Sequence, residues 1–181
     1  MRTMKKNIHN LLGYLLAIVL FLPNSAFSGT EFAETKGFMA AESFAQAIPL
    51  LDRHIKDNPE DPEAHYLLGV CFINTGKYKG AKERFARAVD LDERYGPAIG
   101  REYKQVGSVA LKKGTYGMAG ILFKRAIEYD PGLQIEIGRQ YFEVGKSYLD
   151  QQQSSTADSL FAIAVRYDPS LQEKINSITS D

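Results

Sequence analysis

Large apolar residues recur three and four positions apart along most of the chain, which is the spacing of one face of an α-helix. His65, Leu68 and Phe72 follow this spacing up to a glycine at position 76. After that glycine the spacing resumes at Tyr78, Ala81, Phe85, Ala88 and Val89. No stretch alternates between apolar and polar residues with a period of two. The pattern therefore predicts an all-α protein built from pairs of helices, without β-strands.

The helix pairs repeat with a fixed period. Residues 99–136 and 137–174 align without a gap and are identical at 16 of 38 positions. The nonapeptide IGREYKQVG, which begins at Ile99, returns as IGRQYFEVG at Ile137. A fainter copy lies another 38 positions upstream, where glycines, alanines and Phe85 match their counterparts. A period of this length indicates stacked units, each consisting of two helices.

These units resemble the tetratricopeptide repeat. The shared pattern is a bulky residue, Leu-Gly or Val-Gly, an aromatic residue, Gly-x-Tyr at the turn, and then Ala, Phe, Ala and a closing Pro. Residues 62–95 match at His65, Leu68, Gly69, Phe72, Gly76, Tyr78, Ala81, Phe85 and Ala88, with Glu93 in place of the proline. Residues 100–133 match at Tyr103, Val106, Gly107, Gly114, Tyr116, Ala119, Phe123, Ala126 and Pro131. Residues 138–171 match at Tyr141, Val144, Gly145, Tyr148, Ala157, Phe161, Ala164 and Pro169, with QQQSST where the turn glycine is expected.

The resemblance implies a right-handed α-solenoid of antiparallel helix pairs with three full repeats. Residues 31–60 are interpreted as a degenerate first unit, because the segment around Phe44, Ala47 and Leu51 resembles a second helix. Residues 172–181 are interpreted as a short cap helix, which a solenoid needs to cover its last apolar face. We expect the helical domain to comprise residues 29–181 and to begin after an export signal.

The period departs from that of the family, whose repeats are 34 residues long. Four extra residues are just over one helical turn, or about 6 Å of rise, so the helical faces stay in register. The segments GPAI (96–99) and QIEI (134–137) are therefore expected to extend the first helices of the second and third units at their N-terminal ends. Glycines seven positions apart in each of these helices predict a close helix crossing. They are Gly100 and Gly107 in one unit, and Gly138 and Gly145 in the next.

Residues 1–28 have the features of an export signal. Three basic residues precede the apolar stretch LLGYLLAIVLFL, a proline at position 23 breaks it, and small residues stand at Ala26 and Ser28. Signal peptidase is expected to cleave after Ser28, which leaves Gly29 at the mature N-terminus and a periplasmic or secreted protein. The apolar stretch is short for a membrane span of roughly 20 residues. An uncleaved anchor in the inner membrane is the alternative.

Charge and composition give no sign of an enzyme. The 22 basic residues balance the 22 acidic ones, but the three basic residues of the signal leave 19 against 22 in the rest of the chain. A mildly acidic domain does not favour nucleic acid as a partner. Cys71 is the single cysteine and is expected to be buried, and His65 occupies a packing position. We find no catalytic constellation, no metal-ligand spacing and no phosphate loop, and we expect no cofactor.

The resemblance places a binding groove on the first helices of the repeats. The groove positions carried over are Glu63, Tyr66, Val70, Ile73 and Asn74 in the first repeat, Arg101, Lys104, Ser108, Leu111 and Lys112 in the second, and Arg139, Phe142, Lys146, Leu149 and Asp150 in the third. We expect Tyr66, Val70, Ile73, Asn74, Arg101, Lys104, Ser108, Lys112, Arg139, Phe142 and Lys146 to contact the partner. Basic residues beside aromatic rings suit a segment that carries carboxylates or a free C-terminus together with an apolar anchor.

Two functions follow from this reading. The first is a non-catalytic scaffold of the bacterial cell envelope that binds a peptide or helix of a partner protein, with membrane contact only through an uncleaved signal. The alternative is a structural module that associates with copies of itself. A structural role for Arg101 and Arg139 is also left open, because either arginine could pair with Glu102, Glu136 or Glu143 instead of a partner.

Overall fold

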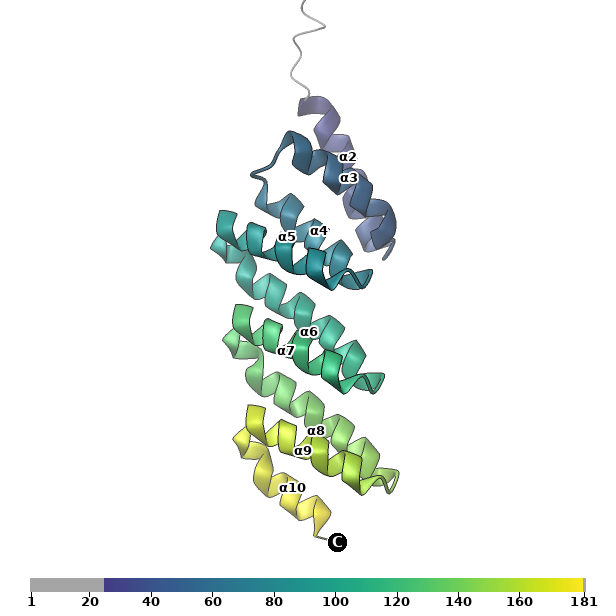
Figure 1. The fold of residues 1–181 in the computed structure, drawn as a ribbon, viewed down its shortest axis with the longest axis vertical. Helices are drawn as coiled ribbons and strands as arrows, with labels where there is room; N and C mark the ends of the chain where they lie inside the picture. The colour runs from purple at the N-terminus through teal and green to yellow at the C-terminus, as the bar shows by residue number, and fades with distance from the viewer. Residues whose placement is uncertain (1–24, 181) are drawn as a thin grey trace, which may run out of the picture.

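The structure is a computed structural model that describes residues 25–180, with side chains from residue 33 onward. Every regular element in this part of the chain is a helix, which confirms the all-α prediction (Figure 1). The α-helices are α2 (Ser25–Ala40), α3 (Phe44–Asp57), α4 (Pro62–Asn74), α5 (Tyr78–Leu91), α6 (Gly96–Lys112), α7 (Tyr116–Tyr129), α8 (Gln134–Asp150), α9 (Ser154–Tyr167) and α10 (Gln172–Thr179). Short 3₁₀ turns precede the later first helices: η1 (Glu93–Tyr95), η2 (Pro131–Leu133) and η3 (Pro169–Leu171).

The predicted export signal lies outside the described residues, apart from residues 25–28. These four residues form the first turn of α2, so the predicted cleavage site falls inside that helix. Within residues 25–180, no helix combines the length and the apolar character needed to cross a membrane.

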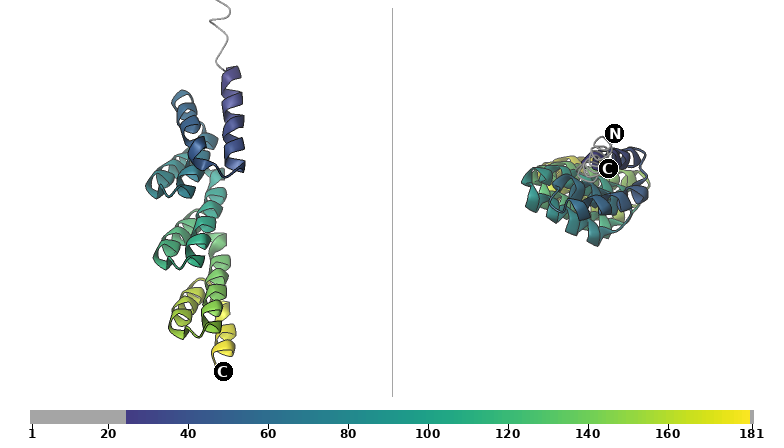
Figure 2. Two further views of the ribbon diagram at one scale, coloured as in Figure 1. Left: turned by 90° about the vertical axis from the view of Figure 1, so that its right-hand side faces the viewer. Right: turned by 90° about the horizontal axis from the view of Figure 1, so that it is seen from above.

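The helices form a stack of antiparallel pairs. α4 packs on α5, α6 on α7, and α8 on α9, while α2 and α3 form a further pair at the N-terminal end of the stack. The first helices of neighbouring units also touch, α4 with α6 and α6 with α8. In Figure 2, α6, α8 and α10 follow one another along one side of the molecule, and α7 and α9 project from the other. The solenoid of helix pairs expected from the repeats is thus confirmed.

The longer period lengthens the first helix, as predicted. α6 and α8 have 17 residues each, whereas α4 has 13. The added residues begin at Gly96 and Gln134, directly after a 3₁₀ turn. An aspartate fixes each turn: the Asp130 carboxylate accepts a hydrogen bond from the Gly132 N–H at 3.0 Å, and Asp92 and Asp168 make the same bond in the other two turns.

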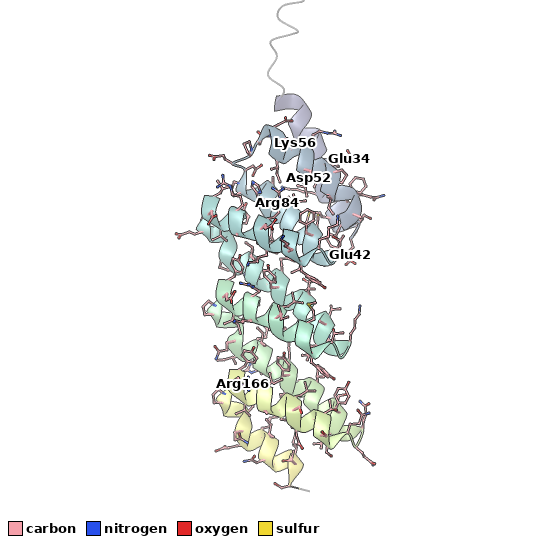
Figure 3. All side chains as sticks on the ribbon, viewed as in Figure 1. Glu34, Glu42, Asp52, Lys56, Arg84 and Arg166 are labelled. Atoms are coloured by element: carbon pink, nitrogen blue, oxygen red, sulfur yellow. The ribbon has the colours of Figure 1, made fainter. Side chains whose placement is uncertain are left out.

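The first helices α2, α4, α6 and α8 all end in the same backbone motif, although only two of them have a glycine there. Gly76 and Gly114 have φ of 76°, and the residues at the matching places, Glu42 (labelled in Figure 3) and Gln152, have φ of 55° and 60°. In each motif the next N–H bonds back to the carbonyl five residues earlier, as from Gln153 to Tyr148 at 2.9 Å. This is a Schellman cap, which glycine usually provides because side chains disfavour left-handed backbone. The hydrogen bonds hold the turn even where the glycine is missing.

In each of the three full repeats, a phenylalanine of the second helix lies over a glycine of the first helix and holds the pair together. A Cβ atom added at Gly107 would lie 2.9 Å from Phe123 Cδ1 and 3.3 Å from Leu122 Cβ. The same contact recurs between Gly145 and Phe161, and between Gly69 and Phe85. Distances below 3.0 Å are essentially never found for real Cβ atoms. The close crossing predicted from the paired glycines is therefore confirmed.

A tyrosine of the following first helix covers the other side of two of these phenylalanines. Tyr103 meets Phe85 with ring centroids 5.3 Å apart at 62°, and Tyr141 meets Phe123 at 5.4 Å and 67°. These edge-to-face arrangements are favourable for aromatic rings. Each tyrosine also stacks on a tyrosine of its own unit, Tyr103 on Tyr129 and Tyr141 on Tyr167. The core therefore continues from unit to unit through aromatic side chains.

Gly107→Ala should destabilise the protein, because the added Cβ must displace the Phe123 ring or separate the two helices. Overpacking of this kind costs about 1–3 kcal/mol. The matched control is Gly117→Ala in α7, where an added Cβ would meet nothing within 4 Å. There the higher helix propensity of alanine should stabilise the protein by up to about 1 kcal/mol. Urea denaturation measures the change in the free energy of unfolding for both variants. Two changes of the same sign would show that the predicted helix crossing is wrong.

Candidate functional site

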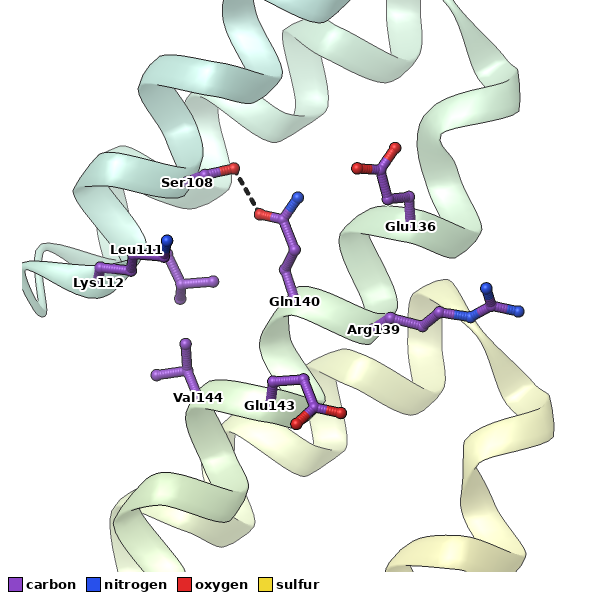
Figure 4. Close-up of a pocket in the computed structure, with 8 residues that line it drawn as sticks. All are labelled: Ser108, Leu111, Lys112, Glu136, Arg139, Gln140, Glu143 and Val144. Atoms are coloured by element: carbon purple, nitrogen blue, oxygen red, sulfur yellow. Dashed lines mark hydrogen bonds between the residues drawn. The ribbon is translucent and has the colours of Figure 1, made fainter.

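A pocket of about 420 Å³ lies between the first helices of the second and third repeats. Ser108, Leu111 and Lys112 come from α6, and Glu136, Arg139, Gln140, Glu143 and Val144 come from α8 (Figure 4). Leu111 and Val144 point toward each other across it, whereas the charged side chains spread around the edge. We call this the α6–α8 pocket. An apolar interior with a few polar groups at the rim is the usual composition of a binding pocket.

Two bridges connect α6 to α8 beside the pocket. The Lys104 ammonium donates to the Glu136 carboxylate oxygens at 2.6 and 2.7 Å. The Ser108 hydroxyl donates to Gln140 Oε1 at 2.5 Å and also contacts the Lys104 carbonyl. Lys104 is partly shielded from solvent by this pairing. These bonds connect the two first helices that form the walls of the pocket.

The equivalent bridge one unit earlier joins α4 to α6. The Tyr66 hydroxyl donates to Glu102 Oε1 at 3.0 Å, and the Tyr66 ring contacts Tyr95 at 5.2 Å between centroids. Burial raises the pKa of Glu102, and the bond from Tyr66 only partly opposes this effect. Burial and the nearby Glu102 charge also raise the pKa of Tyr66. Gln140 occupies the place that matches Glu102, 38 residues later, so one bridge contains a carboxylate and the other an amide.

Several predicted groove residues lie on the surface of the first helices. Arg101, Lys112, Lys146 and Asn74 are exposed, and the Asn74 amide donates to the Val70 carbonyl at 2.9 Å. Tyr66, Lys104 and Ser108 are half-buried because they form the bridges described above. Of the predicted contact residues, Ser108, Lys112 and Arg139 line the α6–α8 pocket.

Three other predicted groove residues belong to the core in this structure. Val70 and Ile73 are 6% and 1% exposed, because α6 packs over this part of α4. Phe142 is 1% exposed; its ring contacts Phe161, and the Lys174 ammonium of α10 lies 4.5 Å from the ring centroid. The expectation that Phe142 lies on the surface among the basic residues is wrong. The remaining surface of the first helices is more polar than the sequence suggested.

Arg139 pairs with a residue that the sequence analysis did not consider. Its Nε lies 3.7 Å from Oδ2 of Asp168, a buried oxygen that has no hydrogen-bond partner in the described part of the chain. The Arg139 side chain remains 68% exposed, so this contact is loose. Arg101 is exposed and makes no hydrogen bond or ion pair with the side chains that the structure describes, although its charge acts on Glu102. Both guanidinium groups keep free donors.

Four further residues line the pocket that were not predicted from the sequence: Glu136, Gln140, Glu143 and Val144. The repeat alone could not identify them, because the offset between stacked first helices varies. The Tyr66–Glu102 bridge spans 36 positions, whereas the Lys104–Glu136 and Ser108–Gln140 bridges both span 32. For Glu136 and Gln140, the signal that could have found them is a polar or charged residue 32 positions before each, on the preceding first helix.

Two residues with reactive side chains have structural roles. Cys71 is fully buried, as predicted, and burial raises the pKa of its thiol to about 11, which keeps the thiol protonated. His65 is 4% exposed and contacts the Pro59 carbonyl through Nε2 at 3.0 Å, with Arg84 near its other nitrogen. Within residues 33–180, no group of three or more His, Cys, Asp or Glu side chains is arranged to hold a metal ion.

Comparisons with known proteins agree with the repeat pattern. Residues 38–99 match the family model of the tetratricopeptide repeat, which confirms the predicted resemblance. The comparison with curated proteins gives no match. Among solved structures, a crystal structure of MamA is similar with a TM-score of 0.45 and 20% identity, over 95% of this chain and 95% of MamA. A second MamA crystal structure has a TM-score of 0.45 and 21% identity, over 81% of this chain and 75% of that one. PilF of Pseudomonas aeruginosa has a TM-score of 0.39 and 20% identity, over 81% of this chain and 63% of PilF.

Glu102→Gln should make stability less dependent on pH. Because the pKa of Glu102 is raised in the folded protein, its protonated form favours folding. That contribution is present below the unfolded pKa of about 4.3 and is lost as the pH rises through the folded pKa. A glutamine oxygen can still accept from Tyr66. Thus the variant and the original protein should be equally stable near pH 3.5, and the variant should be more stable at pH 7.

The control for this comparison is Glu143→Gln, which removes an exposed carboxylate from α8. Denaturant titrations at several pH values measure all three proteins. A Glu102→Gln variant that is less stable than the original protein at pH 7 would contradict the sign of this prediction.

Proposed function

We propose that this protein is a non-catalytic scaffold of the bacterial cell envelope that binds a segment of a partner protein at the α6–α8 pocket. Tetratricopeptide-type repeats generally act as protein-binding scaffolds, and residues 38–99 match that family. The observation that carries the proposal is the pocket itself, with an apolar interior between two first helices that polar bridges connect. A pocket of this size accommodates one or two side chains of an extended segment or a helix.

The interior and rim together indicate the chemistry of the bound segment. Val144 is half-buried and offers an apolar surface for an aliphatic or aromatic anchor, and Leu111, which is 1% exposed, lies beside it in the pocket. Lys112 is exposed at the rim, and Arg139 has donors that Asp168 does not use. A carboxylate next to the anchor can therefore make charge-assisted hydrogen bonds with these two residues. Glu143 at the same rim limits how much negative charge the segment can carry.

The location in the envelope rests on the sequence of residues 1–28. A basic start, an uncharged apolar stretch and small residues at Ala26 and Ser28 form an export signal. The partner is accordingly a protein of the periplasm or of the membranes that border it, or a protein outside the cell.

Self-association is the second candidate, and one surface favours it. Met118 and Ile121 lie on one face of α7 and are 37% and 62% exposed. The residues that match Ile121 in the other repeats are polar, Glu83 and Ser159. An apolar pair restricted to one unit would suit a contact with a second copy, on the side of the molecule from which α7 projects.

Photocrosslinking in intact cells of the native host tests the proposal. The photoreactive residue p-benzoylphenylalanine replaces Lys112 or Glu143 at the pocket rim, or Lys124 on the exposed surface of α7 as the control. Both rim positions should crosslink to the same envelope protein, and position 124 should not. Crosslinks from position 124 to a second copy, without any from the rim, would favour self-association instead.

A charge-reversal variant then tests the role of the arginines. A hydrogen bond to a charged group contributes about 1.5–3 kcal/mol. Arg139→Glu should therefore reduce the rim crosslinks about tenfold or more, while Arg101→Glu, which changes a residue outside the pocket lining, should reduce them less; the melting temperature should stay nearly constant in both. A large fall in melting temperature would show that the arginines are structural. Undiminished crosslinking would remove them from the binding site.

A further inference from the structure

Two arginines stand at matching positions of consecutive first helices, Arg101 on α6 and Arg139 on α8. Both side chains are exposed. In Figure 4 the Arg139 side chain extends away from Leu111 and Val144, so its guanidinium group lies at the edge of the α6–α8 pocket. Arg101 does not line this pocket. The chemistry proposed for the pocket therefore assigns a contact to Arg139 and none to Arg101.

The bridges between α6 and α8 give the separation of the two arginines. The short Ser108 side chain bonds to Gln140, and both bridges join residues 32 positions apart, so residues at this offset lie opposite each other. Matching residues are 38 rather than 32 positions apart, which displaces them by about 9 Å along the helix axis. Packed helices lie about 8–10 Å apart. The axial and lateral displacements together separate the Cα atoms of Arg101 and Arg139 by about 13 Å.

An extended polypeptide covers this distance in four residues, because it rises about 3.3 Å per residue. Its side chains alternate between two faces, so residues i and i+4 point to the same side. Two carboxylates four positions apart can therefore reach both guanidinium groups at once, each through charge-assisted hydrogen bonds. The residue midway between them lies over the Lys104–Glu136 bridge, whose charges cancel, so it needs no charge of its own.

A helical segment suits this surface less well than an extended one. An amphipathic helix binds through apolar residues on successive turns, which lie in a hydrophobic groove. Val70, Ile73 and Phe142, the apolar residues expected along the first helices, are buried in the core. The α6–α8 pocket has room for one or two side chains, and the rim and the bridges beside it are polar. A helix would therefore find too few apolar contacts on this surface.

We infer that the first helices bind an extended segment of a partner protein with two carboxylates four positions apart, one held by Arg101 and the other by Arg139. The inference rests on the proposed function, because it extends the segment bound at the α6–α8 pocket toward the N-terminal end of α6. The carboxylate at Arg139 stands next to the apolar anchor, and Arg101 recognises the second carboxylate. Arg101 is free to do so, because it makes no hydrogen bond or ion pair with the side chains that the structure describes.

Nuclear magnetic resonance of the full-length ¹⁵N-labelled protein tests the inference, because the Nε–H signals of Arg101 and Arg139 report binding directly. The first probe is the peptide acetyl-SDSGSDLS-amide, in which the aspartates are four positions apart and the leucine follows the second one. The second probe, acetyl-SSGDSDLS-amide, has the same composition with the aspartates two positions apart. The first peptide should shift both arginine signals, whereas the second should shift only that of Arg139. The first should also bind about two- to fivefold more tightly, which is the gain expected from one additional exposed ion pair.

Three variants make the test specific. Arg101→Gln should remove the preference for the first peptide and leave the affinity for the second unchanged. Arg139→Gln should weaken the binding of both peptides. Lys124→Gln removes the same charge from the exposed surface of α7 and should preserve the preference. Equal affinities of the two peptides for the original protein, or a preference that survives in Arg101→Gln, would overturn the inference.

The inference and the proposed function can fail separately. Peptides that bind equally well and both depend on Arg139 would support the α6–α8 pocket and overturn only the spacing of the carboxylates. Failure of both peptides to bind would overturn the inference, whereas the photocrosslinks from Lys112 and Glu143 would still test the pocket in cells. A dimer that the first peptide dissociates in sedimentation experiments would show that a second copy supplies the segment, and it would overturn the assignment to a partner protein.

Discussion

The phenylalanine in the second helix of each full repeat is the residue on which the rest of the structure depends. Phe123 lies over Gly107 of its own first helix and meets Tyr141 of the next unit edge-on. One side chain thus sets both the distance between the helices of a pair and the position of the following pair. A side chain at Gly107 would occupy the space of the ring, and without Tyr141 the ring would have no partner in the next unit. The contact recurs with Phe85, so the stack is built from one repeated packing rule.

This rule explains where binding surfaces can form. The aromatic contacts bury the surface between second helices and following first helices, so the accessible sites lie elsewhere. One such place is the α6–α8 pocket, where first helices meet through polar bridges such as Lys104–Glu136 rather than through packed rings.

The sequence predicted the features that depend on period and residue size. The helix pairs, the extended first helices and the close approach at Gly107 follow from a 38-residue repeat with conserved spacing inside the chain. The sequence could not predict contacts that depend on how one unit is rotated on the next. The burial of Phe142 and the pairing of Arg139 with Asp168 are examples, because both depend on helices that follow later in the chain. The left-handed backbone at Gln152 could not be predicted either, because glutamine does not usually adopt a positive φ.

The central claim is that Phe123 and Tyr141 interact directly and thereby connect two units. A double-mutant cycle with Phe123→Leu, Tyr141→Leu and the combined variant measures this interaction by urea denaturation at pH 7. Edge-to-face aromatic pairs contribute about 0.5–1.5 kcal/mol beyond the burial of their surface. The account predicts a coupling free energy in that range, so the losses in the two single variants should sum to more than the loss in the double variant. Strictly additive losses would mean that the two rings do not interact, and the units would then be connected by other contacts.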